Sequence, residues 1–148
     1  MKLSESSDYK TAVFASLNGQ LDDAKQAYER LLDKAEANDD DVAISFLMQS
    51  LANVEARLGN FQLGHELHLR AIGQSSGVPL NLIVYAKGLV NYFDDAQLAE
   101  QKLTEAESLI ESGKWNRRVD TISAESYAQQ IAEVRKAIGG RPQDLAEE

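Results

Sequence analysis

The sequence predicts an all-α fold in which helical hairpins stack side by side. The main observation is a sparse frame that occurs three times: a turn residue, an apolar residue two later, a small residue five later, a large side chain nine later, then another apolar residue. The copies begin at Gly19, Gly59 and Asp94, 40 and 35 residues apart. Repeats of this length are typical of stacked helical hairpins. The second observation is that the 148 residues contain only 2 prolines, Pro79 and Pro142, so long helices can form between them.

A first helix is expected upstream of each frame, and apolar spacing supports it for the second and third copies. Steps of four, three and four residues place side chains on one face of a helix. These steps occur at Leu47, Leu51, Val54 and Leu58, then at Leu82, Ala86, Leu89 and Phe93, and again at Tyr127, Ile131, Val134 and Ile138. The first hairpin is less regular. Its face is expected to include Phe14, or alternatively Tyr9, Val13 and Leu17.

These patterns predict seven helices in one domain that spans residues 1–148. The expected helices are 7–17, 21–36, 40–58, 61–73, 79–93, 95–112 and 121–139. They pair into three repeats at about 7–36, 40–73 and 79–112. The last helix has no second helix to pair with and is expected to cap the apolar edge of the stack, and a polar tail, 140–148, follows it. An apolar content of 43% is sufficient for a continuous core in a chain of this length.

The repeated frame resembles the tetratricopeptide repeat in a degenerate form with long helices. That family places a glycine before the second helix, an alanine inside it, an aromatic residue four later and an alanine three after that. The corresponding residues are Gly19, Ala24, Tyr28 and Leu31, then Gly59, Gly64, His68 and Ala71, then Asp94, Ala99, Leu103 and Ala106. The resemblance covers about residues 8–139. It implies a right-handed superhelical stack that binds proteins or peptides.

Composition narrows the classes of function. The net charge of −9 argues against nucleic-acid binding, because phosphate contacts need a basic surface. It favours a basic partner over an acidic one, but the preferred interpretation is that the acidic excess keeps the protein soluble. The absence of cysteine excludes disulfides and thiolate chemistry. The N-terminus lacks the apolar core of a signal peptide, and no apolar run is long enough to span a membrane. We therefore expect a cytoplasmic protein with neither nucleic acid nor membrane as a partner.

No pattern predicts catalysis, a cofactor or a metal site. His65 and His68 are too close together for the zinc-protease motif. His68 occupies the large-residue position of its repeat, so we expect it to pack in the core, where phenylalanine would be tolerated. His65 is expected to meet solvent. Acidic clusters at 22–23, 39–41 and 94–95 lie at predicted helix starts, where carboxylates cap free amides, and they lack the pattern of a calcium loop. The sequence contains neither a phosphate loop nor a nucleophile elbow.

The candidate binding site is a concave groove formed by the first helices, as the family implies. Asparagine and glutamine can bond a peptide backbone, tyrosine can bury a large area, and Gly88 leaves a gap between such side chains. The predicted groove residues are Gln49, Asn53, Arg57, Asn81, Tyr85, Asn91 and Tyr92. The basic and aromatic segment around Trp115, from Lys114 to Arg118, is an alternative contact surface or a structural anchor for its loop.

Together these observations predict a non-enzymatic scaffold or adaptor for a protein or peptide. One alternative is a self-assembling structural protein, in which the apolar edges join copies of the chain into a homo-oligomer. Another is an acidic inhibitor or immunity-like protein that neutralises a basic partner. Only this last class predicts association that weakens steeply with added salt.

Overall fold

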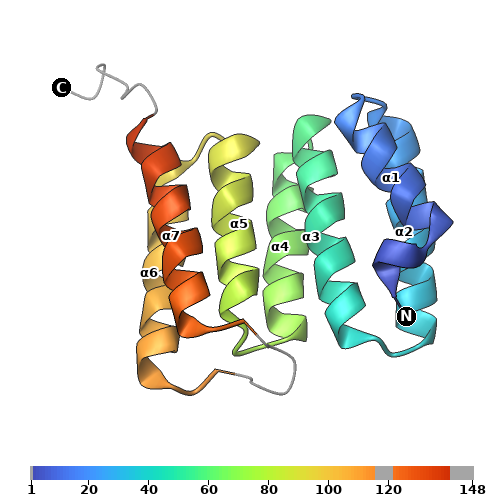
Figure 1. Ribbon diagram of the computed structural model, residues 1–148. Coiled ribbons are helices and arrows are strands. Elements are labelled where there is room, and N and C mark those ends of the chain that lie inside the picture. Colours follow the sequence, from blue (N-terminus) through green and yellow to red (C-terminus); the bar gives the residue numbers. More distant parts are fainter. Residues whose placement is uncertain (1, 116–121, 141–148) are drawn as a thin grey trace.

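The structure is a computed structural model that describes residues 2–115 and 122–140, and the regular secondary structure of these residues is all helical (Figure 1). A short 3₁₀ turn, Leu3–Glu5, precedes the first α-helix. The α-helices are α1 (Ser7–Leu17), α2 (Leu21–Ala37), α3 (Asp41–Arg57), α4 (Phe61–Gln74), α5 (Pro79–Asn91), α6 (Ala96–Ser112) and α7 (Ala124–Gly139). The described residues contain no strand, so the all-α prediction is confirmed. The largest boundary difference is at α7, which begins at Ala124 because the Ser123 hydroxyl caps it by accepting from the Ser126 amide.

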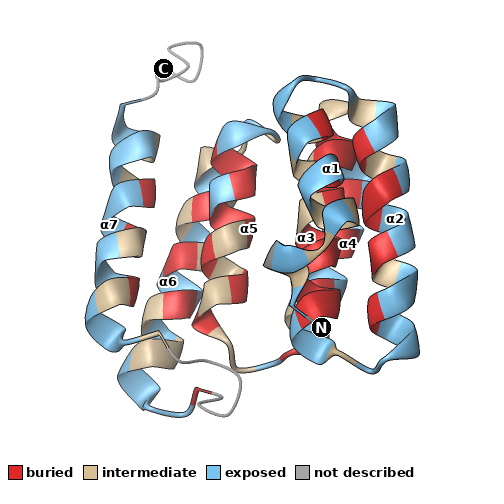
Figure 2. Cartoon of the chain, turned by 45° about the vertical axis from the view of Figure 1, so that its right-hand side comes forward, coloured by how far each residue is buried: buried red, intermediate tan, exposed pale blue. Residues whose placement is uncertain are grey.

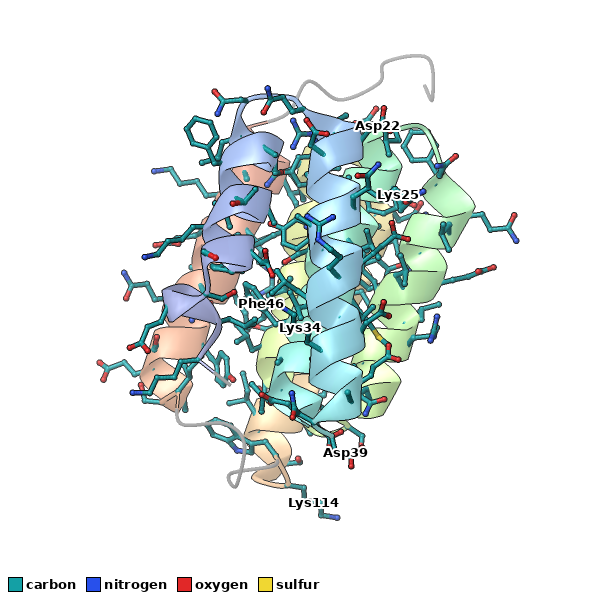
Figure 3. All side chains as sticks on the ribbon, turned by 90° about the vertical axis from the view of Figure 1, so that its right-hand side faces the viewer. Asp22, Lys25, Lys34, Asp39, Phe46 and Lys114 are labelled. Carbon is teal, nitrogen blue, oxygen red and sulfur yellow. The ribbon has the colours of Figure 1, made fainter. Side chains whose placement is uncertain are left out.

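The helices are arranged as hairpins. α1 packs most closely with α2, α3 with α4, and α5 with α6, while α2 also packs against α3 and α7 packs mainly against α5. Figure 1 shows α1 in front of α2, α3 in front of α4, and α7 in front of α6. In this view α5 lies between the α3–α4 pair and the α6–α7 pair. Figure 3 views the stack from its α1–α2 end, with Lys25 labelled on α2. No described helix is long and apolar enough to cross a membrane.

The turn residues of the repeated frame share one backbone conformation. Gly19, Gly59 and Asp94 have φ values of 74°, 91° and 52°. This left-handed conformation lets the chain reverse between the two helices of a hairpin, and glycine adopts it at the lowest cost. Asp94 adopts it as well, which explains why the third copy of the frame can begin without a glycine.

The remaining frame positions form the core. The small residues Ala24, Gly64 and Ala99 are buried, as are the large residues Tyr28, His68 and Leu103. Gly64 permits a particularly close approach, because a Cβ there would lie 2.8 Å from the Phe93 ring and 2.9 Å from the Ala52 carbonyl oxygen. The small positions therefore set the distance between neighbouring helices, and the large positions fill the space between them.

The face predicted for the first helix is confirmed only at Tyr9, which is partly buried and packs against the core. Phe14 is 67% exposed and Leu17 is 80% exposed, whereas Ala12 and Ala15 are buried. α1 lies at the end of the stack, so no described element covers large apolar residues on its outer side. Its inner side uses alanines, which bring it close to α2.

A layer of buried polar side chains lies where the second and third hairpins meet. One apolar cluster is built from residues of α1 to α4, and a second from residues of α5 to α7 together with Trp115. Figure 2 shows buried residues along the facing sides of these helices. The buried polar residues at this junction are Ser45, Gln49, His68, Ser75 and Asn81. The two apolar clusters are thus joined partly through hydrogen bonds.

Charged side chains cap the helices and hold the last one in place. Asp40 and Asp95 accept bonds from the Ala43 and Leu98 amides at the starts of α3 and α6, as expected of two acidic clusters. The third cluster, at 22–23, lies in the first turn of α2 without a side-chain cap. Arg135 of α7 makes a bidentate pair with Glu107 of α6, with N–O distances of 2.6 and 2.7 Å, and this pairing holds the pKa of Glu107 below its ordinary value.

Candidate functional site

The candidate site is a groove between α3 and α5, over the junction of the second and third hairpins. Its volume is about 200 Å³. The walls are apolar and the floor is polar. The wall residues are Val42 and Phe46 from α3, Val78, Leu80 and Val84 at the start of α5, and Ile122 before α7. The floor residues are Ser45, Gln49, Ser75 and Asn81.

Phe46 is the only aromatic residue in the described lining of this groove. It is 42% exposed, and its ring centroid lies 6.0 Å from that of Tyr9 on α1. In Figure 3 its label falls in the gap between the ribbons of α1 and α2. Val42 lies one turn earlier on the same face of α3 and is also exposed. Partly exposed apolar side chains around a hollow are a common feature of surfaces that bind other molecules.

One face of α5 continues from this groove into a second hollow. Leu80 and Val84 line the groove, and Lys87 and Asn91 follow at steps of three and four residues. Those two residues line a hollow of about 100 Å³ between α5 and α7, together with Gln130 and Glu133. A partner segment lying along α5 would therefore meet an apolar surface first and next a mixed surface, in which Lys87 and Glu133 lie beside Val90 and Val134.

The floor of the groove is fixed by hydrogen bonds. Gln49 Nε2 donates to the Asn81 carbonyl oxygen at 2.9 Å and lies 3.2 Å from His68 Nδ1. Asn81 Nδ2 donates to the Ser75 carbonyl oxygen at 3.4 Å. The hydroxyls of Ser45 and Ser75 are 2.9 Å apart, and Ser45 also donates to the Ala71 carbonyl oxygen. These bonds connect α3, α4 and α5, so the floor is a rigid part of the fold.

His68 is the centre of this network. It is fully buried, its Nε2 lies 2.9 Å from Asn53 Oδ1, and its ring stacks on Tyr85 with centroids 4.6 Å apart. Because a Gln49 amide hydrogen points to Nδ1, that nitrogen is the acceptor and Nε2 carries the proton. Burial, followed by the nearby His65, lowers the pKa of His68 to about 3. The ring is therefore neutral near pH 7.

This pKa predicts that acid lowers the stability of the protein through His68. The folded value, about 3, lies below the unfolded value of 6.5, so the unfolded chain binds the proton more readily between these pH values. The contribution of His68 is complete above pH 6.5 and declines as the pH falls, by about 1.4 kcal/mol per unit. We expect the parent to lose about 2 kcal/mol more free energy of unfolding from pH 7 to pH 5 than His68→Phe does. Urea titrations of both proteins would measure this, and equal losses would contradict it.

Gly88 of α5 makes room for this arrangement. A Cβ at Gly88 would lie 2.5 Å from Asn53 Oδ1 and 3.2 Å from His68 Nε2. The gap expected at Gly88 is therefore filled by the Asn53 side chain. The glycine allows α3 and α5 to approach closely enough for the hydrogen bond between Asn53 and His68.

The predicted groove residues fall into different environments. Gln49 and Asn81 line the floor of the groove but are buried, and Asn91 lines the hollow between α5 and α7. Arg57 donates to the carbonyl and hydroxyl oxygens of Ser16 on α1 at 3.0 Å, and its guanidinium lies 5.8 Å from the centroid of the exposed Tyr92 ring. Gln49, Asn53 and Arg57 are therefore engaged within the fold.

The expectation that Tyr85 faces a partner is corrected by its burial. Tyr85 is 1% exposed, packs against His68, and places its hydroxyl 2.7 Å from His65 Nδ1. Burial and the nearby Asp95 carboxylate raise its pKa to about 12. His65, which was expected to meet solvent, is partly buried by these contacts and by the Phe93 ring. The cause is the position of α4, which packs against the side of α5 that carries Tyr85.

The apolar wall residues Val42, Phe46 and Val84 are not among the groove residues predicted from the sequence. One signal was available: Val42, Phe46, Gln49 and Asn53 follow steps of four, three and four residues, beside the core stripe that begins at Leu47. A second stripe that begins with two apolar residues, on a helix that already has a core stripe, indicates another contact surface.

The remaining candidates from the sequence are the segment around Trp115 and a metal site. Trp115 is buried against Tyr127, with ring centroids 5.5 Å apart, in keeping with a structural anchor. The remainder of the basic segment, 116–118, and the tail from 141 onward lie outside the described residues. Among the residues that are described, no group of three or more potential ligands is placed to hold a metal ion.

Comparisons with protein-family models, with curated proteins and with solved structures find no match to this chain.

Proposed function

We propose that this protein is a non-catalytic binding module that holds an apolar segment of a partner protein or peptide in the groove between α3 and α5. The observation that carries the proposal is the combination of apolar walls, formed by Val42, Phe46 and Val84, with a rigid polar floor that contains Gln49. An apolar anchor surrounded by a few placed polar groups is the usual composition of a recognition site. The occupant is a segment with one large apolar side chain.

The proposal includes a superhelical stack like that of tetratricopeptide proteins. The support is the threefold frame, with its left-handed turn residues and buried small and large positions. In such a stack the first helices of the hairpins line one side. Here the groove lies between α3 and α5, and the neighbouring hollow lies between α5 and α7. The function suggested by the resemblance and the function suggested by the groove are then the same.

A peptide-display selection tests this function. Random peptides would be selected on the immobilised parent and then measured against Phe46→Glu and Phe61→Glu. The two phenylalanines are matched in exposure, 42% and 48%, but Phe61 lies on α4 and does not line the groove. We expect Phe46→Glu to weaken the affinity for the selected peptides by at least tenfold, because a carboxylate in the groove must be desolvated. Phe61→Glu should leave that affinity unchanged. Failure to enrich any peptide, or peptides that bind Phe46→Glu as well as the parent, would contradict the proposal.

Self-assembly is the second candidate, and α1 carries the observation that favours it. Phe14 and Leu17 are the two most exposed large apolar residues among those described, and both lie at the end of the stack. A second copy covering them would lengthen the stack. Light scattering tests this candidate. It is favoured over the first if the molar mass of the parent rises with concentration and that of Leu17→Glu stays at the monomer value.

A further inference from the structure

The floor of the groove offers a hydrogen-bond acceptor in a fixed position. Both hydrogens of Gln49 Nε2 are used, one by the Asn81 carbonyl oxygen and one by His68 Nδ1. This fixes the orientation of the amide, and no described residue donates to its Oε1. Gln49 therefore contributes only an acceptor to the groove. The bond from Asn81 Nδ2 to Ser75 likewise leaves Asn81 Oδ1 without a described donor.

The rest of the lining is uncharged and mainly apolar. Among the residues that the structure describes, it contains six apolar residues and no lysine, arginine, histidine, aspartate or glutamate. The described lining thus provides no counter-charge for a carboxylate or an ammonium group, and desolvation would oppose the entry of either. An occupant without any polar atom would fill the space but would cover the Gln49 oxygen without giving it a hydrogen bond. The lining fits a neutral, largely apolar group that ends in a donor.

We propose that the anchor of the partner segment is a tryptophan side chain, whose indole N–H donates to Gln49 Oε1 while its rings pack against Phe46 and Val84. This inference rests on the proposed function of the groove. Indole is a large apolar body with one donor and no acceptor. A tyrosine hydroxyl would also bring lone pairs, for which Gln49 has no free donor. Tryptophan is also among the side chains that dominate binding energy at interfaces.

Three small probes test the hydrogen bond directly. The full-length, ¹⁵N-labelled protein would be titrated with N-acetyl-tryptophanamide, with its 1-methylindole analogue, and with N-acetyl-phenylalaninamide, while amide shifts are followed by NMR. The methyl group removes the donor and retains the rings. We expect saturable shifts at Phe46 and Val84 with the first probe, and binding at least about tenfold weaker with the other two.

Matched variants locate the binding. Phe46→Ala should weaken the binding of N-acetyl-tryptophanamide, and Phe61→Ala should not, since of these two phenylalanines only Phe46 lines the groove. Thermal melts of both variants would establish that they are folded. Equal binding of the tryptophan and 1-methyl probes would overturn the hydrogen bond. Absence of shifts at Phe46 and Val84 with N-acetyl-tryptophanamide would overturn the tryptophan anchor.

The peptide selection separates this failure from failure of the proposed function. Selected peptides that depend on Phe46 but contain no tryptophan would leave the groove as a binding site and overturn only its assignment to tryptophan. Selected peptides that contain tryptophan and lose binding when its indole is methylated would support both.

Discussion

Replacing His68 by alanine is expected to lower the free energy of unfolding by about 3–5 kcal/mol. The first cause is a cavity, because the ring is fully buried and stacks on Tyr85. The second is the loss of two hydrogen-bond partners, since Gln49 Nε2 and Asn53 Oδ1 both face this ring. Buried polar groups left without partners add to the cost of the cavity. Few single substitutions combine these two mechanisms.

Phenylalanine at the same position distinguishes the two contributions. From the sequence, phenylalanine was expected to be tolerated, because an aromatic residue stands here in the family the chain resembles. The structure changes that expectation. A phenyl ring fills most of the cavity but bonds neither Gln49 nor Asn53, so we expect His68→Phe to cost about 1–3 kcal/mol at pH 7.

Chemical denaturation of the two variants at pH 7 checks both values. His65→Ala is a suitable control, because it removes the neighbouring imidazole, which is only partly buried and bonds to the Tyr85 hydroxyl. We expect it to cost less than His68→Ala. Full stability of His68→Phe would show that the hydrogen bonds contribute nothing, and the structural role assigned to the network would then be wrong.

Replacing Gly88 by alanine is expected to lower the free energy of unfolding by about 2–3 kcal/mol, although alanine is the better helix former. The new Cβ would lie 2.5 Å from Asn53 Oδ1, so Asn53 must move and its bond with His68 must break. Crowding and the lost hydrogen bond together outweigh the gain in helix propensity of about 1 kcal/mol.

Gly73→Ala is the matched control for this substitution. Gly73 also lies within a helix, α4, but nothing lies within 4 Å of the position of its Cβ. At this position only the higher helix propensity of alanine acts, and we expect the free energy of unfolding to rise by about 0.5–1 kcal/mol. Thermal or urea unfolding of both variants provides the comparison. The same sign of effect for both would contradict the close approach at Gly88.

Much of the secondary structure could be predicted from the sequence, because its causes are local. The turns before α2, α4 and α6 follow from residues that tolerate a left-handed conformation, and their positions determine where the helices end. The stripe from Leu47 to Leu58 predicts the buried side of α3, because apolar spacing reflects helix geometry. The burial of His68 followed in the same way from its place in the frame.

The groove could be predicted only in part, because its composition depends on how close the helices come. α3, α4 and α5 approach one another where Gly88 and Gly64 lack side chains. Because the helices come this close, Gln49, Asn53 and Tyr85, which were predicted to contact a partner, instead contact other residues of the fold.

The sequence by itself determined the number and approximate extent of the described helices, the hairpin pairing and the buried frame positions, since each follows from spacing along one or two helices. Only the tertiary structure decided which polar residues face one another and which apolar residues stay uncovered. Phe14 and Phe46 illustrate the reason. Each is an apolar residue on a helix, and each is exposed because none of the described helices fully covers its position. Such coverage depends on distances between segments far apart in the chain, and a one-dimensional pattern does not contain those distances.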